Sequence, residues 1–339
     1  MGQLSVGIMG AGSIGCYVGG RLLASRAADV TFVGRERVAQ ELAEHGLTVR
    51  DHNNAVTISP EHITFASDPA AIAGCDVIAV SVKSAHTPEV GQDLADVLPP
   101  GTTVVSIQNG VRNATTLRES LPTCTVVAGV VDFNVVSLGD GVFHCGLGGG
   151  LSFARGAAAL ADSLRNAGFA VTEHADIAPI QWTKLLVNLN NAVSALSDVP
   201  TREMLASRSY RRVIAALITE GVDTLRTAGI RPAPLRGLPV ALMPRILRLP
   251  DALAHIVLRA QIRADPHARS SMWEDLTRRR STEVDFLNGE IVRLGADAGV
   301  SAPLNSRMVE LVHAAEAAGA GPPGISAGAL WDELRAGQV

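Results

Sequence analysis

The sequence contains only four cysteines, and their arrangement excludes a redox pair and a zinc centre. No two of them form a C-x-x-C pair, and their spacings fit no zinc-binding pattern. Three of the four lie in or beside apolar stretches, where a buried free thiol is expected. We therefore predict no metal site and a reducing compartment. The four residues are Cys16, Cys75, Cys124 and Cys145.

The sequence also lacks a long apolar run and an excess of positive charge. No apolar stretch reaches the roughly 20 residues that cross a membrane, and the formal net charge is −4. The single dense basic run, Arg278-Arg279-Arg280, is typical of a solvated helix face. The first residues lead into an apolar strand without a cleavable leader. We therefore expect a cytoplasmic protein that binds neither nucleic acid nor membrane.

What the sequence does contain is an ordinary globular composition, with 47% hydrophobic and 18% charged residues. A chain of 339 residues is longer than a single hydrophobic core usually accommodates, so we expect two domains. Residues 1–175 alternate strand and helix, which indicates an α/β domain with a doubly wound, mainly parallel sheet. The predicted strands are 4–9, 29–33, 75–82, 102–107 and 124–128, and the predicted helices are 14–25, 36–45, 87–97 and 111–119.

The end of the first domain has a different pattern. Residues 130–136 and 141–145 are typical of a hairpin, which we expect to extend the sheet. A helix at 157–167 and a strand at 170–172 then close the domain.

Beyond residue 176 the strand patterns almost vanish, so residues 176–339 are predicted to form an all-α domain. Four prolines make residues 231–245 a predicted loop, since proline breaks helices. The predicted helices of this domain are 177–197, 202–228, 250–263, 282–298 and 302–317.

A glycine turn, Gly10-Ala11-Gly12-Ser13-Ile14-Gly15, follows the first predicted strand and opens the first predicted helix. In this context the pattern is the fingerprint of a Rossmann dinucleotide site. Gly10 permits the tight turn, Gly12 lets the backbone approach the pyrophosphate, and Gly15 lets helix and strand pack closely. The helix N-terminus adds N–H groups and a partial positive charge. A bound dinucleotide is therefore favoured over a glycine turn without a ligand.

The end of the second strand favours NADP over NAD. An NAD site usually has an acidic residue there, which binds the ribose hydroxyls. Here the position is Gly34, and Arg35 follows it. A guanidinium suits the additional 2′-phosphate of NADPH. The alternative is that Arg35 is only a solvated charge.

Lys83 and Asn109 follow two further predicted strands. In this topology the carboxyl ends of the strands face the ligand crevice. Each residue alone also fits turn chemistry, because Asn-Gly is a common turn pair. Their equivalent positions on two parallel strands favour ligand contact.

The predicted helix 177–197 is mainly apolar but carries Lys184, Asn188 and Asn191 on one face, at spacing i, i+4, i+7. The alternative is a solvated stripe, for which asparagine is a poor helix residue. Reduction of a ketone leaves negative charge on oxygen, which a lysine can neutralise and protonate. Arginine cannot take this role because it does not deprotonate.

Ser271 and Glu283 are weaker candidates when judged from spacing alone. Ser270 or Ser271 also fits a helix cap, and Thr282 with Asp285 fits a variant capping pair.

Together these motifs resemble the ketopantoate reductase family (2-dehydropantoate 2-reductases). The resemblance implies a Rossmann domain and a helical domain of the 6-phosphogluconate dehydrogenase C-terminal type. It implies reduction of 2-dehydropantoate to (R)-pantoate, a step toward pantothenate and coenzyme A. The matching segments are G-A-G-S-I-G at 10–15, G-R at 34–35, V-K at 82–83, Q-N-G at 108–110, K-L-L-V-N at 184–188, S-S-M at 270–272 and T-E-V-D-F-L-N-G at 282–289.

The resemblance also implies a role for each candidate residue. Lys184 is the implied proton donor, and Asn188 and Ser271 bind the substrate. Asn109 touches both substrate and cofactor. The other implied NADPH contacts are Gly10 to Gly15, Arg35, Lys83, Ala128 at the end of its strand, and Glu283 of the helical domain.

The sequence departs from the family pattern in two places. The second substrate asparagine is expected eight residues after the lysine, where this chain has Ala192. Asn191 is one residue earlier and is our candidate substitute. The segment 231–266 is longer than compact family members need, and it fits an oligomer contact or a lid. A homodimer is therefore left open.

Three functions follow. The first is ketopantoate reduction, and the second is reduction of another branched or bulky 2-oxo acid, which Ala192 favours. The third is a non-enzymatic NADP(H) sensor, which would not need a lysine flanked by amides. No histidine lies in a metalloprotease or nucleophile-elbow pattern, so we interpret the histidines as ordinary surface or packed residues.

Overall fold

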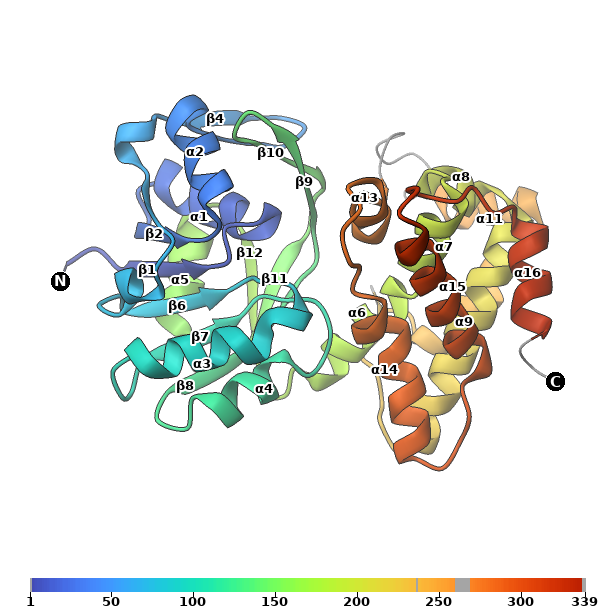
Figure 1. Cartoon of the computed structure of the whole chain (residues 1–339). Coiled ribbons are helices and arrows are strands. Elements are labelled where there is room, and N and C mark those ends of the chain that lie inside the picture. The colour runs from blue at the N-terminus through green and yellow to red at the C-terminus, as the bar shows by residue number, and fades with distance from the viewer. Residues whose placement is uncertain (1, 236, 260–268, 337–339) are drawn as a thin grey trace. The chain divides into compact units, whose positions relative to one another are not determined.

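The computed structural model describes residues 2–235, 237–259 and 269–336 (Figure 1). The chain divides into two compact units, Met1–Ile177 and Ala178–Val339, which we call unit 1 and unit 2. Within the described ranges, no helix is both long and apolar enough to cross a membrane.

Unit 1 is built on an eight-stranded sheet in the order β12-β11-β8-β7-β6-β1-β2-β5. All neighbouring strands are parallel except β11 and β8, which are antiparallel. The predicted mainly parallel sheet is therefore confirmed. The strands are β1 (Ser5–Met9), β2 (Asp29–Val33), β5 (Thr64–Ala66), β6 (Val77–Val80), β7 (Thr103–Ser106), β8 (Thr125–Val131), β11 (Gly150–Ala154) and β12 (Ala170–His174).

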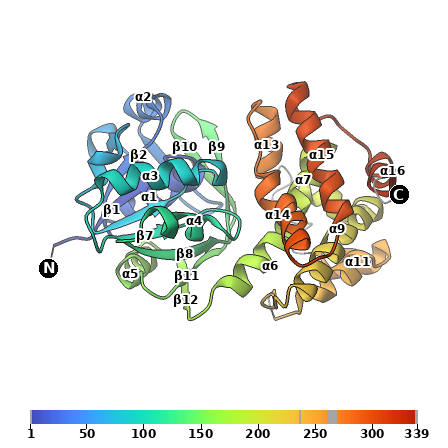
Figure 2. The ribbon, with the colours of Figure 1, turned by 60° about the horizontal axis from the view of Figure 1, so that its bottom comes forward.

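Helices cover both faces of this sheet, as the doubly wound pattern requires (Figures 1 and 2). Apolar side chains of α1 and α5 share one buried cluster with the strands. Helices α3 and α4 pack together on the other face. The helices are α1 (Ser13–Ala24), α2 (Glu36–His45), α3 (Thr87–Val97), α4 (Asn113–Ser120) and α5 (Ala158–Asn166), with short 3-10 helices η1 (Pro60–His62), η2 (Pro69–Ile72) and η3 (Ser84–His86).

The predicted hairpin is present as β9 (Asn134–Gly139) and β10 (Val142–Leu147), but it does not extend the main sheet. That expectation was wrong. The hairpin belongs to a second sheet of order β4-β3-β10-β9. Strands β3 (Leu47–Arg50) and β4 (Ala55–Ile58), which the sequence analysis missed, provide an edge for β10 to pair with in parallel. The edge of the main sheet is instead taken by β11 and β12.

The regular secondary structure of the described residues of unit 2 is helical, apart from one isolated β-bridge. Helix α9 is its centre and packs against α14, α15, α16, α10, α8, α6 and α7. The helices are α6 (Ala178–Asn188), α7 (Asn190–Ser197), α8 (Thr201–Ala206), α9 (Arg208–Thr227), 3-10 helix η4 (Val240–Leu242), α10 (Met243–Leu247), α11 (Asp251–Val257), α13 (Ser271–Thr277), α14 (Val284–Asp297), α15 (Pro303–Ala318) and α16 (Ala327–Ala336).

The proline-rich segment is not only a loop, which corrects the sequence-based expectation. Pro239 is the N-cap residue of η4, and Pro244 lies in the first turn of α10. Beyond this segment, Pro250 is the N-cap residue of α11. A proline at a helix start costs no hydrogen bond, because the first N–H groups have no helical acceptor. In place of the predicted helix 250–263, α11 ends at Val257, and residues 260–263 lie outside the described ranges. Of the segment 231–266, residues 236 and 260–266 lie outside them.

Arg211 anchors this segment to α9. Its side chain is fully buried and donates to Leu247 O and Leu249 O at 3.0 Å each. It also donates to Leu205 O and Ala206 O of α8 at 3.0 and 2.9 Å. One guanidinium therefore supplies a donor to four main-chain carbonyls, from α8, from the end of α10 and from the residues after it.

We predict that Arg211→Met destabilises unit 2 by about 3 kcal/mol, because it removes the donor to four main-chain carbonyls at once. Urea unfolding followed by circular dichroism measures this. Arg226→Met is the matched control, since Arg226 lies on the same helix with its side chain 76% exposed, and its midpoint should equal that of the wild type. Equal midpoints for the two variants would refute the anchoring role.

Candidate active site

The glycine turn packs tightly between three strand ends. Gly10 has a φ of +110°, and its N–H and that of Ala11 donate to Val33 O at 2.9 and 3.0 Å. Ser81 Oγ donates to Gly10 O at 2.7 Å. A Cβ at Gly15 would overlap Gly10 O and lie 2.6 Å from Ser81 Oγ. Helix α1 therefore approaches the strands this closely only because residue 15 is glycine.

The first turn of α1 presents N–H groups that have no acceptor within the helix. Gly12 is the N-cap residue, with φ −93° and ψ −170°, and offers no side-chain cap. Residues 13–15 precede the first helical hydrogen bond, which runs from Cys16 N to Gly12 O. The first turn contains no acidic residue, and a Cβ at Gly12 would meet nothing within 4 Å. This helix end is suited to a phosphate group.

Gly34 directly follows β2 and packs against the glycine turn, which leaves no space for a side chain. A Cβ at this position would lie 2.7 Å from Ala11 Cβ and 3.1 Å from Phe65 Cζ. Packing thus excludes the acidic residue typical of NAD sites. Arg35 follows as the exposed N-cap residue of α2. Within the described part of the chain, no acidic side chain forms an ion pair with its guanidinium.

Lys83 and Asn109 follow β6 and β7, which are adjacent parallel strands. Lys83 is the N-cap residue of η3, and Asn109 precedes Gly110, whose φ is +87°. Both candidate side chains are half-buried. The structure therefore brings these two residues to the same edge of the sheet.

A buried network of polar side chains, which the sequence analysis missed, restrains both strand ends. Gln108 Nε2 donates to Val82 O at 3.0 Å and to Thr87 Oγ1 at 2.7 Å. Thr87 Oγ1 donates to Asn113 Oδ1 at 2.9 Å. Asn113 Nδ2 donates to Asn109 O at 2.5 Å. Because all three network side chains are buried, these bonds fix the main chain beside both candidates.

Ala128 lies inside β8 and not at its end, which corrects the position expected for it. It pairs with Ser106, the last residue of β7. Strand β8 nevertheless continues to Val131, because β11 pairs with its final residues. Ala128 is buried.

The predicted helix 177–197 is two helices, α6 and α7, interrupted at Leu189. Asn190 Nδ2 donates to Val187 O at 2.6 Å. Asparagine side chains that bond to the backbone in this way compete with helical hydrogen bonds. The continuous helix that the sequence predicted was therefore wrong at this position.

The three candidates of this region lie on both sides of the interruption. Lys184 and Asn188 are one turn apart on α6, where Lys184 is half-buried and Asn188 is 8% exposed. Asn191 is half-buried on α7, whereas Ala192 is 0% exposed. Since Ala192 is fully enclosed, Asn191 is the more accessible of these two neighbours.

Ser271 is the first residue of α13, and its neighbour Ser270 is the N-cap residue. Ser270 Oγ accepts from Trp273 N at 3.1 Å and donates to Asn191 O at 3.0 Å. The capping role thus belongs to Ser270. The same hydroxyl ties α13 to α7, which brings Ser271 close to Asn191.

Glu283 is the N-cap residue of α14 and is half-buried between the buried residues Thr282 and Val284. Thr282 Oγ1 accepts from Val284 N at 3.2 Å. Asp285 does not complete a capping pair with Thr282, because its carboxylate lies 2.9 Å from His313 Nε2.

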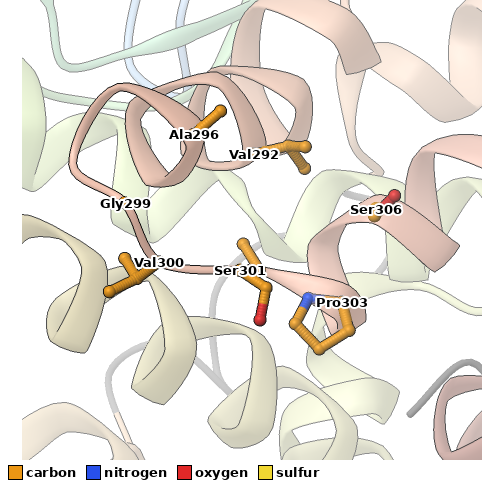
Figure 3. Close-up of a pocket in the computed structure, with 8 residues that line it drawn as sticks. Val292, Ala296, Gly299, Val300, Ser301, Pro303 and Ser306 are labelled. Carbon is orange, nitrogen blue, oxygen red and sulfur yellow. The ribbon is translucent and has the colours of Figure 1, made fainter. Parts of the chain in front are cut away.

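A pocket of about 410 Å³ in unit 2 contains none of the candidate residues (Figure 3). Small and mainly apolar side chains line it, so it offers no group for proton transfer. The lining residues come from the end of α14, the start of α15 and the loop between them: Val292, Ala296, Gly299, Val300, Ser301, Ala302, Pro303 and Ser306.

The sheet order and the glycine turn of unit 1 are those of the dinucleotide-binding α/β class. Residues 6–157 match the family model described as "Ketopantoate reductase PanE/ApbA", and residues 176–316 match the model of its C-terminal part. The chain belongs to the ketopantoate reductase family and is an oxidoreductase. This family uses NADPH. The predicted family and fold class are thereby confirmed.

Relatives match over nearly the full chain. The 2-dehydropantoate 2-reductase of Halobacterium salinarum is 29% identical and covers 92% of this chain and 99% of its own. A solved PanE/ApbA family ketopantoate reductase from Ralstonia eutropha JMP134 is 30% identical, with a TM-score of 0.78 over 93% of this chain and 99% of its own. A D-mandelate dehydrogenase solved with NADH and anilino(oxo)acetate has a TM-score of 0.76 at 23% identity, over 93% of this chain and 99% of its own. The last likeness is one of fold.

Two alanine substitutions in the glycine turn should have different effects. Gly12→Ala adds a methyl group into open space, so we expect an unchanged melting temperature and NADPH affinity about tenfold weaker. Gly15→Ala forces a methyl group onto Gly10 O, so we expect a destabilisation of about 2 kcal/mol. Thermal unfolding and fluorescence titration with NADPH measure both. Wild-type NADPH affinity in Gly12→Ala would contradict a pyrophosphate at this turn.

Proposed function

We propose that this protein reduces 2-dehydropantoate (ketopantoate) to (R)-pantoate with NADPH. The observation that carries the proposal is the use of lysine. The chain has 29 lysine and arginine residues, and only Lys83 and Lys184 are lysines. Arginine supplies the positive charge everywhere else. Lysine is kept at the two positions where the family motifs have it, which supports a need for a group that gives up a proton.

The residues of unit 1 suit the phosphate groups of NADPH. The N–H groups of residues 13–15 are our proposed donors to the pyrophosphate. Arg35 is the proposed partner of the 2′-phosphate, supported by its exposure and by the packing that excludes an acid at Gly34. Lys83, Asn109, Ala128 and, from unit 2, Glu283 are the proposed further cofactor contacts.

The proposed chemical step is the addition of hydride to the C2 carbonyl carbon of the substrate. NADPH supplies the hydride when bound. The electron pair of the C=O π bond moves to oxygen, and the ammonium group of Lys184 transfers a proton to it. The ketone becomes an alcohol and Lys184 becomes a neutral amine, which regains a proton from solvent. A half-buried lysine is well suited to this role, because its charge acts more strongly on the developing oxyanion where water is scarce.

Uncharged polar side chains are the proposed substrate ligands. Asn188, Asn191 and Ser271 of unit 2, together with Asn109, would orient the carboxylate and hydroxyl groups of the substrate. The hydrogen bond from Ser270 Oγ to Asn191 O supports this grouping, because it ties together two of the three elements. Amides and hydroxyls bind the polar groups without adding a charge that would compete with Lys184 for the oxyanion.

A second candidate function is reduction of another bulky 2-oxo acid. The fully enclosed Ala192 favours it, because the family asparagine is missing at that position. The NADP(H) sensor is the weaker alternative, since sensing would not require Lys184. A homodimer stays a prediction for this chain.

We expect ketopantoate to be turned over with NADPH far faster than other 2-oxo acids. The test mixes the purified protein with NADPH and a panel of 2-oxo acids that includes phenylglyoxylate, and follows absorbance at about 340 nm. A different preferred acid would support the second candidate. Tight NADPH binding without turnover of any acid would instead support the sensor.

We predict that Lys184→Ala lowers kcat about a thousandfold, within the range for loss of a general acid. The dissociation constant of NADPH should change less than about twofold. Lys184→Arg is the matched variant, because it keeps the charge but cannot release the proton. Stopped-flow kinetics and fluorescence titration measure the two effects. Full activity in Lys184→Arg would show that charge alone suffices, and loss of NADPH binding would show that the lysine acts on the cofactor.

A further inference from the structure

His313 of α15 lies between two carboxylates on different elements. Its Nε2 is 2.9 Å from Asp285 Oδ1 on α14, and its Nδ1 is 2.9 Å from Glu316 Oε2 on α15. A neutral imidazole has one N–H and can donate to only one of them. Both short contacts are favourable together only when the ring carries a proton on each nitrogen. The geometry is therefore that of an imidazolium bridge.

The charges around the ring support this state. Its hydrogen bond to Glu316 raises the pKa of His313, against a smaller opposing effect of burial, and Asp285 adds to the rise. Burial would raise the pKa of Glu316, but hydrogen bonds from Thr282 and His313 outweigh it and lower that pKa. Helix α15 also packs against α7, α9 and α16. Among the described residues, Asp285 and Glu316 are the charged groups that act on the ring.

Glu316 extends the bridge to the main chain before α14. Its Oε1 accepts from Thr282 N at 2.6 Å, and Thr282 directly precedes Glu283. The connection between α13 and α14, residues 278–283, is also held near its start, because Arg280 N donates to Asp275 O at 2.8 Å. The carboxylate of Glu316 is thus the fixed point that sets the backbone at the start of α14.

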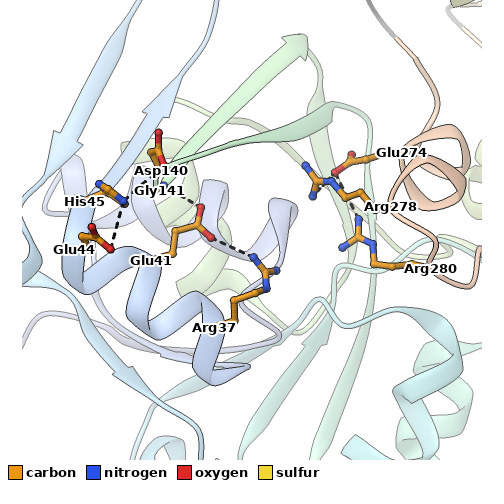
Figure 4. Close-up of polar contacts among 9 residues, drawn as sticks. All are labelled: Arg37, Glu41, Glu44, His45, Asp140, Gly141, Glu274, Arg278 and Arg280. Carbon is orange, nitrogen blue, oxygen red and sulfur yellow. Dashed lines mark hydrogen bonds and ion pairs between the residues drawn. The ribbon is translucent and has the colours of Figure 1, made fainter. Parts of the chain in front are cut away.

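The arginines beside this connection are directed toward α13. Arg278 and Arg280 lie 2.8 and 3.6 Å from Glu274 (Figure 4). Glu274 of α13 therefore compensates their charges locally. Glu316 joins Thr282 to α15, and His313 bonds to that same carboxylate.

We propose that His313 is a positioning residue for the cofactor, and that its protonation couples NADP(H) affinity to pH through Glu316, Thr282 and Glu283. The proposal rests on the proposed role of Glu283 in cofactor binding. Below the pKa of His313 the imidazolium donates to both carboxylates and the backbone at Thr282 is fixed. As the pH rises through that pKa, one nitrogen loses its proton and presents a lone pair to a carboxylate. The bridge then opens at one side, and affinity falls.

Isothermal titration with NADP⁺ from pH 6 to pH 9 tests this with two variants of opposite kind. His313→Arg keeps a charge that does not titrate and can reach both carboxylates. His313→Gln is neutral at every pH. We expect His313→Gln to bind about fivefold more weakly than wild type at pH 6 and equally at pH 9. We expect His313→Arg to equal wild type at pH 6 and to bind about fivefold more tightly at pH 9.

His45→Gln is the matched control, because Nε2 of His45 also lies near two carboxylates, Glu44 and Asp140, at 3.7 and 3.6 Å (Figure 4). It should follow the wild type at every pH. The dissociation constant of each variant is divided by that of the wild type at the same pH. This ratio removes the effect of protonation of the NADP⁺ phosphate, which is the same for every protein in the comparison. A thermal melt at each pH separates a folding defect from a change in affinity.

The outcomes distinguish this inference from the proposed function. Absence of NADP⁺ binding by the wild type at any pH would overturn both. Binding with one common pH profile for wild type, His313→Arg and His313→Gln would overturn only the role of His313. Equal weakening of both variants at every pH would also overturn it, because that result is a structural loss without coupling to protonation.

Discussion

Close packing around Gly10 and Gly15 is the constraint on which unit 1 depends. The start of α1 rests directly on the end of β6, with Ser81 Oγ bonded to Gly10 O. One residue further, Val82 O accepts from Gln108, so the end of β7 is tied to the same point. The network then continues through Asn113 to the carbonyl of Asn109. A chain of short contacts thus joins the proposed phosphate site to both polar residues at the strand ends.

Unit 2 orients its candidates in a different way, by connecting helix ends. Ser270 links the start of α13 to α7, and Glu316 links the residue before Glu283 to α15. Helix ends have backbone groups without helical partners, so a side chain that satisfies one of them also fixes its position. The candidate residues Ser271 and Glu283 each stand beside such a bond. The main chain at both residues is therefore fixed in position, although neither residue lies in the middle of a helix.

The sequence predicted six of the eight strands of the main sheet, because those strands are apolar and alternate with helices, but it missed β5 and β11. It failed where the signal is short or polar, as in β3 and β4, and this failure misplaced the β9–β10 hairpin. The break at Leu189 was missed because the helical spacing of apolar residues continues across it. We attribute the break to one hydrogen bond from the side chain of Asn190 to Val187 O. The motif residues were found from local patterns. The supporting network was not found, because the pairing of its side chains depends on the fold: Gln108 belongs to a quoted motif but its role was missed, and Thr87 and Asn113 were not singled out at all. The restriction of lysine to two positions was a usable signal in the sequence alone.

The fit between Gly34 and Ala11 has a consequence for the evolution and redesign of this protein. The methyl group of Ala11 occupies the space that any side chain at position 34 would need. An acid introduced at position 34 alone meets a steric barrier before it can act on a ribose. A change of coenzyme along this route therefore requires position 11 to lose its methyl group first, or in the same step, and the ring of Phe65 to shift slightly. The two positions, 23 residues apart in sequence, form one mutational unit, and the order of substitutions determines which intermediates still fold.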